Sequence, residues 1–264
     1  MNPTNPTPPP IAASLPPQLP PAAPPPHGNA PGDEPGEREP IGDLFAAVEA
    51  ILRQPRRVMF QVTREGSRPL IAGLLLIAVL SVAVYGLVAG TFSGGAQLWA
   101  APIKLAAGLV LTALICLPSL YIFACLSGSQ ARLMEVIGLV AGMLALMTML
   151  LIGFAPVAWV FSQSTESVGA MGALHLIFLL VALCFGVRFL CSSFERHSPE
   201  SESGPIGVWV VIFLLVALQM TTALRPIVGT AETFLPAEKK FFASHWYSTV
   251  ADTPAKTPRA EGRR

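Results

Sequence analysis

Charged residues are scarce in this sequence. Asp, Glu, Lys and Arg make up 12% of its 264 residues, and 17 basic against 16 acidic side chains leave a formal net charge of +1. A nucleic-acid-binding protein usually carries a basic face, so this balance argues against a nucleic-acid partner. The same scarcity, together with 52% hydrophobic residues, argues against a soluble domain and predicts a polytopic membrane protein.

The sequence also lacks the residue patterns of most catalytic and metal-binding sites. No charged residue falls in the middle of an apolar run, and there is neither a metal-ligand spacing nor a phosphate-binding glycine loop. The cysteines lie in or at the ends of apolar runs, where a thiol behaves as a small hydrophobe: Cys116, Cys125, Cys184 and Cys191. We therefore expect no enzyme activity, no catalytic residues, no cofactor and no bound metal.

Long apolar runs are what this sequence has in abundance. Five of them approach the roughly 20 residues that a membrane-crossing helix needs. They cover residues 70–89, 105–126, 136–155, 168–187 and 206–224. The predicted fold class is therefore all-α, a polytopic membrane helical bundle with about five transmembrane helices, flanked by interfacial amphipathic helices.

The stretch of residues 136–162 has no charged residue and contains Pro156. Because proline has no amide proton and crowds the preceding turn, we expect it to end the membrane-crossing helix near Ala155, so that the following residues turn along the interface. In the second run, Pro102 is expected in the first helical turn, and Pro118 is expected inside the helix, where it would cause a kink.

The N-terminal 40 residues contain 15 of the 26 prolines and have no apolar segment of the kind found in a cleaved secretory signal. This composition predicts a disordered, Pro-rich cytoplasmic arm over residues 1–40. A plain spacer is the favoured interpretation, and a ligand for proline-binding domains is the alternative.

Residues 41–68 form a juxtamembrane segment of different character. After a capping-type Asp43, apolar residues recur at helical spacing, namely Leu44, Phe45, Val48, Ile51 and Leu52. Pro55 is expected to end this amphipathic helix, and a basic stretch with four arginines follows it. Such a segment either lies on an anionic membrane surface or packs against the cytoplasmic end of the bundle, and the sequence favours neither.

Basic residues indicate the orientation in the membrane. Eight of them flank the runs on one side, namely Arg53, Arg56, Arg57, Arg64, Arg68, Arg132, Arg188 and Arg196, and four flank the other side, namely Lys104, Arg225, Lys239 and Lys240. The excess places the N-terminus in the cytoplasm. A five-span domain over residues 69–226 then leaves residues 227–264 outside, as an interfacial helix with an aromatic belt and a tail.

For several residues within or next to the runs, we favour a role in structure over a role in function. His175 is the one histidine within a run, and we expect its imidazole to bond to a nearby backbone or hydroxyl group, with a proton relay as the alternative. Glu135 follows Arg132 at the predicted start of a helix, where an acid is favourable. The paired glycines of residues 86–90 and 138–142 favour packing within the chain over dimerisation.

The layout of a hydrophilic N-terminal arm followed by five closely spaced helices resembles the Yip1-domain family of membrane proteins. The segment FAAVEAILRQPRRVMFQV is similar to the short pre-membrane helix of many bacterial members. This resemblance implies a non-enzymatic membrane organiser that binds other membrane proteins or lipids, and it implies no catalytic residues.

The sequence therefore indicates two alternative functions. The favoured one is a scaffold of the membrane, whose partners are the lipid bilayer and other membrane proteins or further copies of the chain. The alternative is a small transporter or permease subunit. Arginine greatly outnumbers lysine, and Ala and Leu are abundant. This composition suits a GC-rich bacterial genome, so we expect a multi-pass protein of a bacterial cytoplasmic membrane.

Overall fold

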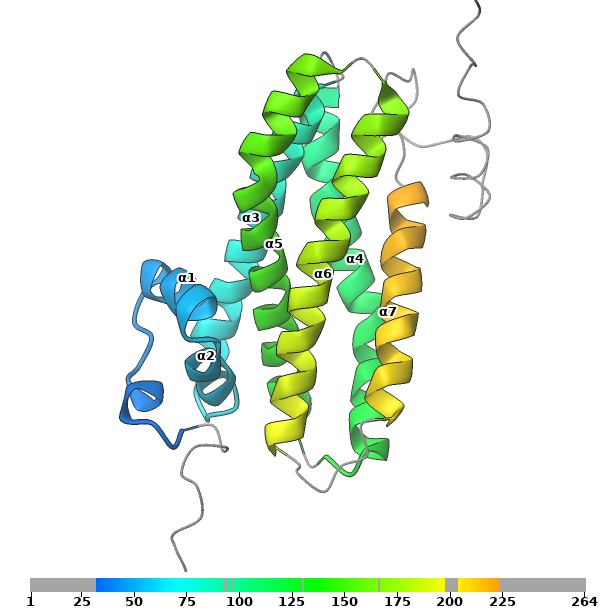
Figure 1. The fold of residues 1–264 in the computed structure, drawn as a ribbon. Coiled ribbons are helices and arrows are strands. Elements are labelled where there is room, and N and C mark those ends of the chain that lie inside the picture. The colour runs from blue at the N-terminus through cyan, green and yellow to red at the C-terminus, as the bar shows by residue number, and fades with distance from the viewer. Residues whose placement is uncertain are drawn as a thin grey trace, which may run out of the picture.

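The computed structural model describes residues 32–92, 95, 97–129, 131–165, 167–197 and 204–223. Over these residues it is all-helical and contains no strand, which confirms the predicted class (Figure 1). The elements are η1 (Pro35–Arg38), α1 (Leu44–Arg53), α2 (Pro55–Val62), α3 (Arg68–Thr91), α4 (Gln97–Leu126), α5 (Leu133–Ser164), α6 (Val168–His197) and α7 (Gly204–Ala223).

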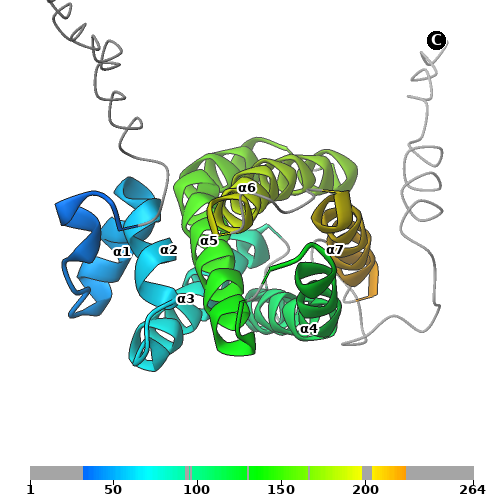
Figure 2. The same cartoon turned by 90° about the horizontal axis from the view of Figure 1, so that it is seen from below.

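The long helices α3 to α7 form an antiparallel bundle around α5. Seen from the end, α3 packs between α4 and α5, while α6 packs on α5 and α7 packs on α4 (Figure 2). The most apolar 18-residue stretch of α5 is 67% buried, whereas the corresponding stretches of α4 and α6 are each 22% buried. Helix α5 is therefore the centre of the bundle, and α4 and α6 turn most of their surface outward.

Four helices of the described structure are long and apolar enough to cross a membrane. They are α3, α5, and the greater part of α4 and α6, within residues Leu98–Leu126 and Gly169–Phe194. The chain is therefore a multi-pass membrane protein. The apolar part of α7, Ile206–Thr221, is shorter, so the fifth crossing stays a prediction.

Two prolines of the bundle, Pro156 and Pro102, lie in helices differently from what the sequence led us to expect. Helix α5 continues through Pro156 to Ser164, so the predicted end near Ala155 is wrong. Proline removes one backbone hydrogen bond, and a membrane helix tolerates this loss when its remaining backbone bonds hold the turns on either side. Helix α4 begins at Gln97, which places Pro102 inside the helix rather than in its first turn, while Pro118 lies inside it as predicted.

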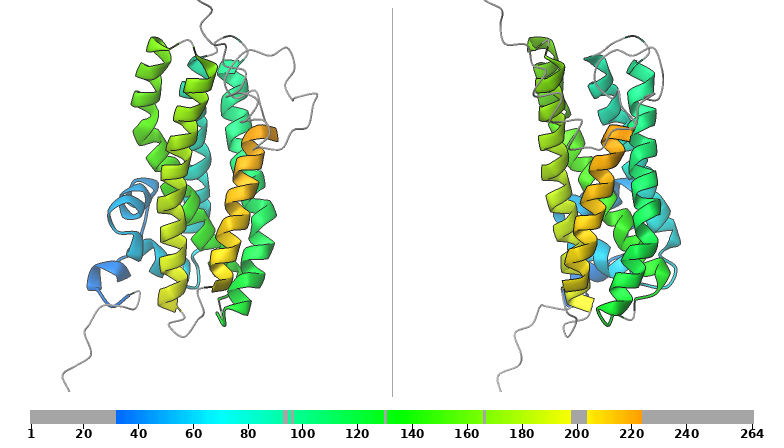
Figure 3. Two further views of the ribbon diagram at one scale, coloured as in Figure 1. Left: turned by 45° about the vertical axis from the view of Figure 1, so that its right-hand side comes forward. Right: turned by 90° about the vertical axis from the view of Figure 1, so that its right-hand side faces the viewer.

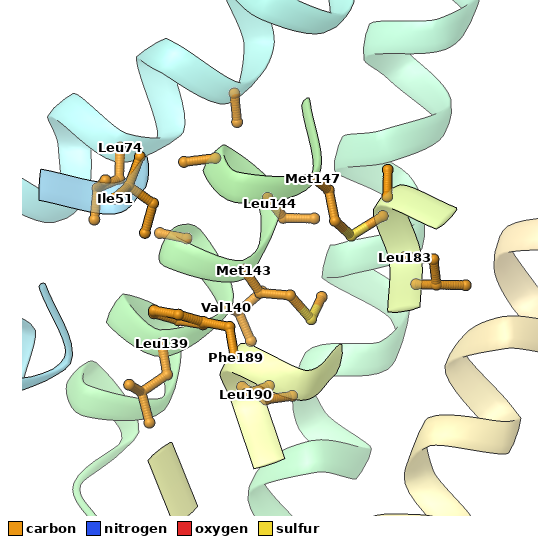
Figure 4. Close-up of a cluster of buried hydrophobic side chains, with 14 of the residues drawn as sticks. Ile51, Leu74, Leu139, Val140, Met143, Leu144, Met147, Leu183, Phe189 and Leu190 are labelled. Atoms are coloured by element: carbon orange, nitrogen blue, oxygen red, sulfur yellow. The ribbon is translucent and has the colours of Figure 1, made fainter. Parts of the chain in front are cut away.

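The paired glycines serve packing within the chain. A Cβ atom added at Gly86 would lie 2.6 Å from the Cα of Pro102, so α3 and α4 meet there backbone to backbone. One added at Gly142 would lie 2.9 Å from the Phe189 ring of α6. Figure 4 shows Phe189 beside Met143 of α5 in the buried cluster. This arrangement agrees with the predicted internal role of the glycines.

Helix α7 is fixed to α4 by a buried polar contact as well as by apolar packing. The Trp209 side chain is 1% exposed, and its indole Nε1 donates a hydrogen bond to the Cys116 carbonyl at 3.0 Å. This carbonyl lies two residues before Pro118, and it also accepts from the Ser119 hydroxyl at 2.8 Å. Figure 3 shows α7 running along α4 in both views.

Candidate functional site

The amphipathic pair α1 and α2 is a platform attached to the side of the bundle, next to α3 and α5 (Figure 2). Ile51, Val58 and Val62 are each 0% exposed. Ile51 lies beside Gly142, and Val62 lies beside Gly138, where an added Cβ would approach its side chain to 2.8 Å. The segment therefore packs against the bundle, and its contact with the membrane surface stays a prediction.

The capping signal at the start of this platform is also confirmed. The Asp43 Oδ1 accepts a hydrogen bond from the Ala46 amide at 2.8 Å, which satisfies one of the free donors at the start of α1. Pro55 does end α1, and it also occupies the first turn of α2, where its missing amide proton costs nothing.

The face of α1 that points away from the bundle carries both apolar and charged side chains. Phe45 is 88% exposed and Leu52 48% exposed, and the exposed ion pair of Glu49 and Arg53 lies beside them. At the edge of this face, the Leu44 side chain, 45% exposed, lies next to Gly73 of α3, three residues before the exposed Leu76. The exposed apolar surface of the platform therefore continues onto the surface of a membrane-crossing helix.

A segment that precedes α1 is bonded to the outer face of α2. We call residues 32–41 the strap. The Arg57 side chain donates to the carbonyls of Glu39 and Pro40 at 3.0 and 3.2 Å, and the Ile41 amide donates to the Gln61 Oε1 at 3.0 Å. Ordered structure thus begins before the boundary at residue 41 that composition indicated. Residues 1–31 of the predicted arm lie outside the described residues.

One acid of the strap is buried. Glu37 is 5% exposed, accepts a hydrogen bond from the Gly32 amide, and pairs with the Arg56 guanidinium at 2.6 Å between Oε1 and Nε. The strap is therefore held by this ion pair and by the hydrogen bonds that Arg57 and Gln61 make to its backbone.

Inside the bundle, Tyr85 of α3 meets His175 of α6. The Tyr85 hydroxyl and the His175 Nδ1 lie 2.6 Å apart, and the two rings are perpendicular, with centroids 5.5 Å apart. The predicted bond of His175 to a hydroxyl group is confirmed. Its other ring nitrogen, Nε2, is buried and has no hydrogen-bond partner among the described residues.

Lys104 is the residue whose position the sequence analysis placed wrongly. We expected it among the basic residues outside the second span, but it lies within α4 with a side chain that is 1% exposed. It continues the buried stripe of Ala101, Gly108 and Thr112 at helical spacing. This spacing could have predicted that Lys104 lies within the helix. It was missed because the apolar run was counted from residue 105.

Glu135 and Arg132 lie at the start of α5, as the sequence predicts. The Glu135 carboxylate accepts from the Arg132 amide at 3.2 Å at the start of α5, while the Arg132 side chain pairs with Glu65 at 3.2 Å. All four cysteines are free, and the described residues contain no group of His, Cys, Asp and Glu that could hold a metal ion. The predicted external helix and tail, residues 227–264, lie outside the described part of the chain.

Fold and site together define a multi-pass helical membrane protein with a helical platform on its flank. Comparison of the chain with protein-family models, curated proteins and solved structures found no match.

Proposed function

We propose that this protein is a non-enzymatic scaffold of the membrane, which binds lipids and other membrane proteins in the manner implied by its resemblance to the Yip1-domain family. The observation that carries this proposal is the contrast between the core and the surface of the bundle. Helix α5 is packed by side chains from its neighbours, whereas α4 and α6 leave large apolar side chains exposed along their length. Those faces offer contact area to lipid and to other transmembrane helices.

We further propose five crossings, with the N-terminus in the cytoplasm of a bacterium and the chain in its cytoplasmic membrane. Helix α7 has 20 residues, about the number that a crossing requires. Arg68 and Arg132 lie at the starts of α3 and α5, at one end of the bundle, and the platform with its further arginines flanks the same end (Figure 1). An excess of arginine at one end favours the cytoplasmic side.

The platform supports the predicted interfacial helix on that side. Its inner face packs on the bundle, while Phe45 and Leu52 remain exposed beside the ion pair of Glu49 and Arg53. A helix of this kind beside membrane-crossing helices reduces its exposed apolar area when Phe45 and Leu52 enter the lipid at the interface and the charged pair stays in water.

The alternative, a small transporter or permease subunit, is favoured by one set of observations. Tyr85, Lys104 and His175 put polar groups inside membrane-crossing helices, where such groups are costly and often functional. Against this alternative, each of the three lies about two turns from the end of its helix rather than at its middle.

Site-directed photocrosslinking in native membranes tests the scaffold. A photoreactive amino acid at Ile177 or Phe185, both exposed on α6, should give discrete adducts with other membrane proteins or with a second copy of the chain. The same group at Leu190, which is 0% exposed on the same helix, is the matched control and should give adducts within the chain alone. Equal adduct patterns at exposed and buried positions would contradict the proposal. So would a substrate flux in proteoliposomes that His175→Ala abolishes in correctly inserted protein.

A further inference from the structure

The outer face of α2 combines arginine with an aromatic ring. Arg57 and Phe60 lie three residues apart on one face of α2, and Arg64 follows two residues after the helix ends at Val62. The opposite face, with Val58, Met59 and Val62, is buried against the bundle. The guanidinium of Arg64 stands 5.6 Å from the centre of the Phe60 ring. Arginine beside an exposed aromatic side chain is typical of a surface that contacts anionic headgroups.

The strap covers part of this face. A Cβ atom added at Gly32 would lie 2.4 Å from the Phe60 ring, which shows that the strap backbone is seated directly on that ring. Glu37 pairs with Arg56, and the carbonyls of Glu39 and Pro40 accept from Arg57. Both arginines of α2 are thus engaged by the strap, whereas Arg64, beyond the end of the helix, is exposed.

The chemistry of the strap matches that of an anionic ligand. It carries Asp33, Glu34, Glu37 and Glu39 against a single arginine, and it presents carboxylate and carbonyl oxygens to guanidinium groups. A headgroup phosphate offers the same kind of acceptor to the same donors, with the fork geometry that arginine favours. The strap therefore occupies the positions that phosphate oxygens would take.

We propose that Arg56, Arg57 and Phe60 form a binding site for the phosphate of anionic lipid headgroups, and that the acidic strap is its intramolecular competitor. In a bilayer poor in anionic lipid the strap stays on α2. In a bilayer rich in anionic lipid, headgroups displace it and α2 engages the membrane surface. The site lies at the level of the first two turns of α3 and α5, because Val62, at the end of α2, and Ile71 of α3 both approach Gly138 of α5. This proposal stands independently of the scaffold function.

Hydrogen–deuterium exchange of the full chain in lipid nanodiscs tests the competition. The amides of the strap are the reporters, because those of Gly32 and Ile41 are hydrogen-bonded when the strap is closed. With phosphatidylglycerol in the disc, exchange over residues 32–41 should be several-fold faster than with phosphatidylcholine alone. Exchange in α5 should be unchanged between the two discs and serves as the internal reference.

Three variants separate binding from strap closure. Glu37→Gln with Glu39→Gln should exchange rapidly in both discs and retain more phosphatidylglycerol by native mass spectrometry. Arg56→Gln with Arg57→Gln should also exchange rapidly but retain less of that lipid than the wild type. Glu65→Gln is the single-charge control, since this acid is 89% exposed and pairs with Arg132 away from the strap, and it should behave as the wild type.

Two results would overturn the proposal. The first is equal exchange of the wild-type strap in both discs together with equal lipid retention by all variants, because the strap would then be a structural clasp alone. The second is opening of the strap by inorganic phosphate in phosphatidylcholine discs to the same extent as by phosphatidylglycerol, because the site would then take free phosphate rather than a headgroup.

Discussion

The bundle and the platform are held together by different interactions. Within the bundle, helices meet through glycines and interlocking apolar side chains, and Gly86 lets α3 and α4 touch backbone to backbone. Around α2, by contrast, arginine and glutamine side chains bond to carbonyls and carboxylates of the strap. Lipid tails are as apolar as leucine, so helices in a membrane associate through the complementary shapes of their surfaces. A segment in contact with water can also be held by ion pairs and charged hydrogen bonds. Changes of shape should therefore damage the bundle, and changes of polarity should affect the platform locally.

The largest effect is expected from Gly86→Ala. The added methyl group would lie 2.6 Å from the Cα of Pro102, which belongs to a backbone that cannot rotate away. Separation of α3 from α4 should destabilise the bundle by about 1–3 kcal/mol, the usual range for overpacking. Thermal unfolding of the detergent-solubilised protein measures this.

Gly153→Ala is the matched control for that substitution. Gly153 also lies inside a bundle helix, but nothing stands within 4 Å of its added Cβ. Because alanine favours the helix more than glycine does, this variant should be as stable as the wild type or slightly more so. Equal destabilisation by both substitutions would contradict close backbone approach as the basis of the α3–α4 contact.

A smaller effect is expected from Tyr85→Phe. The change keeps the ring in place and removes the hydroxyl that lies 2.6 Å from the His175 Nδ1. A hydrogen bond between membrane helices contributes about 0.6 kcal/mol on average and up to about 1.7 kcal/mol. The unfolding temperature of the bundle should fall modestly, and His175→Phe in the Tyr85→Phe background should cost less than His175→Phe alone. Independent, additive losses would show that the two residues do not interact.

The smallest effect on the whole molecule is expected from Asp43→Ala. Loss of this cap typically costs a helix about 1 kcal/mol, and here it affects α1 alone. Hydrogen exchange should rise at the start of α1, while exchange in α5 and the unfolding of the bundle stay unchanged. A matching loss of protection in α5 would contradict the separation of platform from bundle.

The parts of the fold that sequence could predict are those set by hydrophobic length. The 27 uncharged residues around α5 mark the helix that proves most buried, and Asp43 marks the start of α1. Pro156 was misinterpreted because proline costs one hydrogen bond wherever it stands, yet whether a helix ends there depends on its neighbours. The sequence alone does not show which residues lie next to Pro156 in the folded protein.

The candidate sites show the same limit. The bond of His175 to a hydroxyl was predictable as a type, because a histidine among apolar side chains needs a polar partner, but its partner Tyr85 is 90 residues away in the sequence. Lys104 was assigned to the segment outside the second span because a charged residue interrupts an apolar run in the sequence. The ordered strap was not predicted, because its proline-rich composition indicates disorder. In the structure, Arg57 and Gln61 bind its backbone.

The orientation of the chain tests the whole account most directly, because bundle, platform and arginine asymmetry all depend on it. Reporter fusions after Gly42, Ser129, Ser164 and Thr253 measure it in bacterial cells. The account predicts that Gly42 and Ser129 report from the cytoplasm and that Ser164 and Thr253 report from outside. A cytoplasmic signal from Thr253 would reduce the bundle to four crossings, and an external signal from Gly42 would place the platform on the wrong side of the membrane.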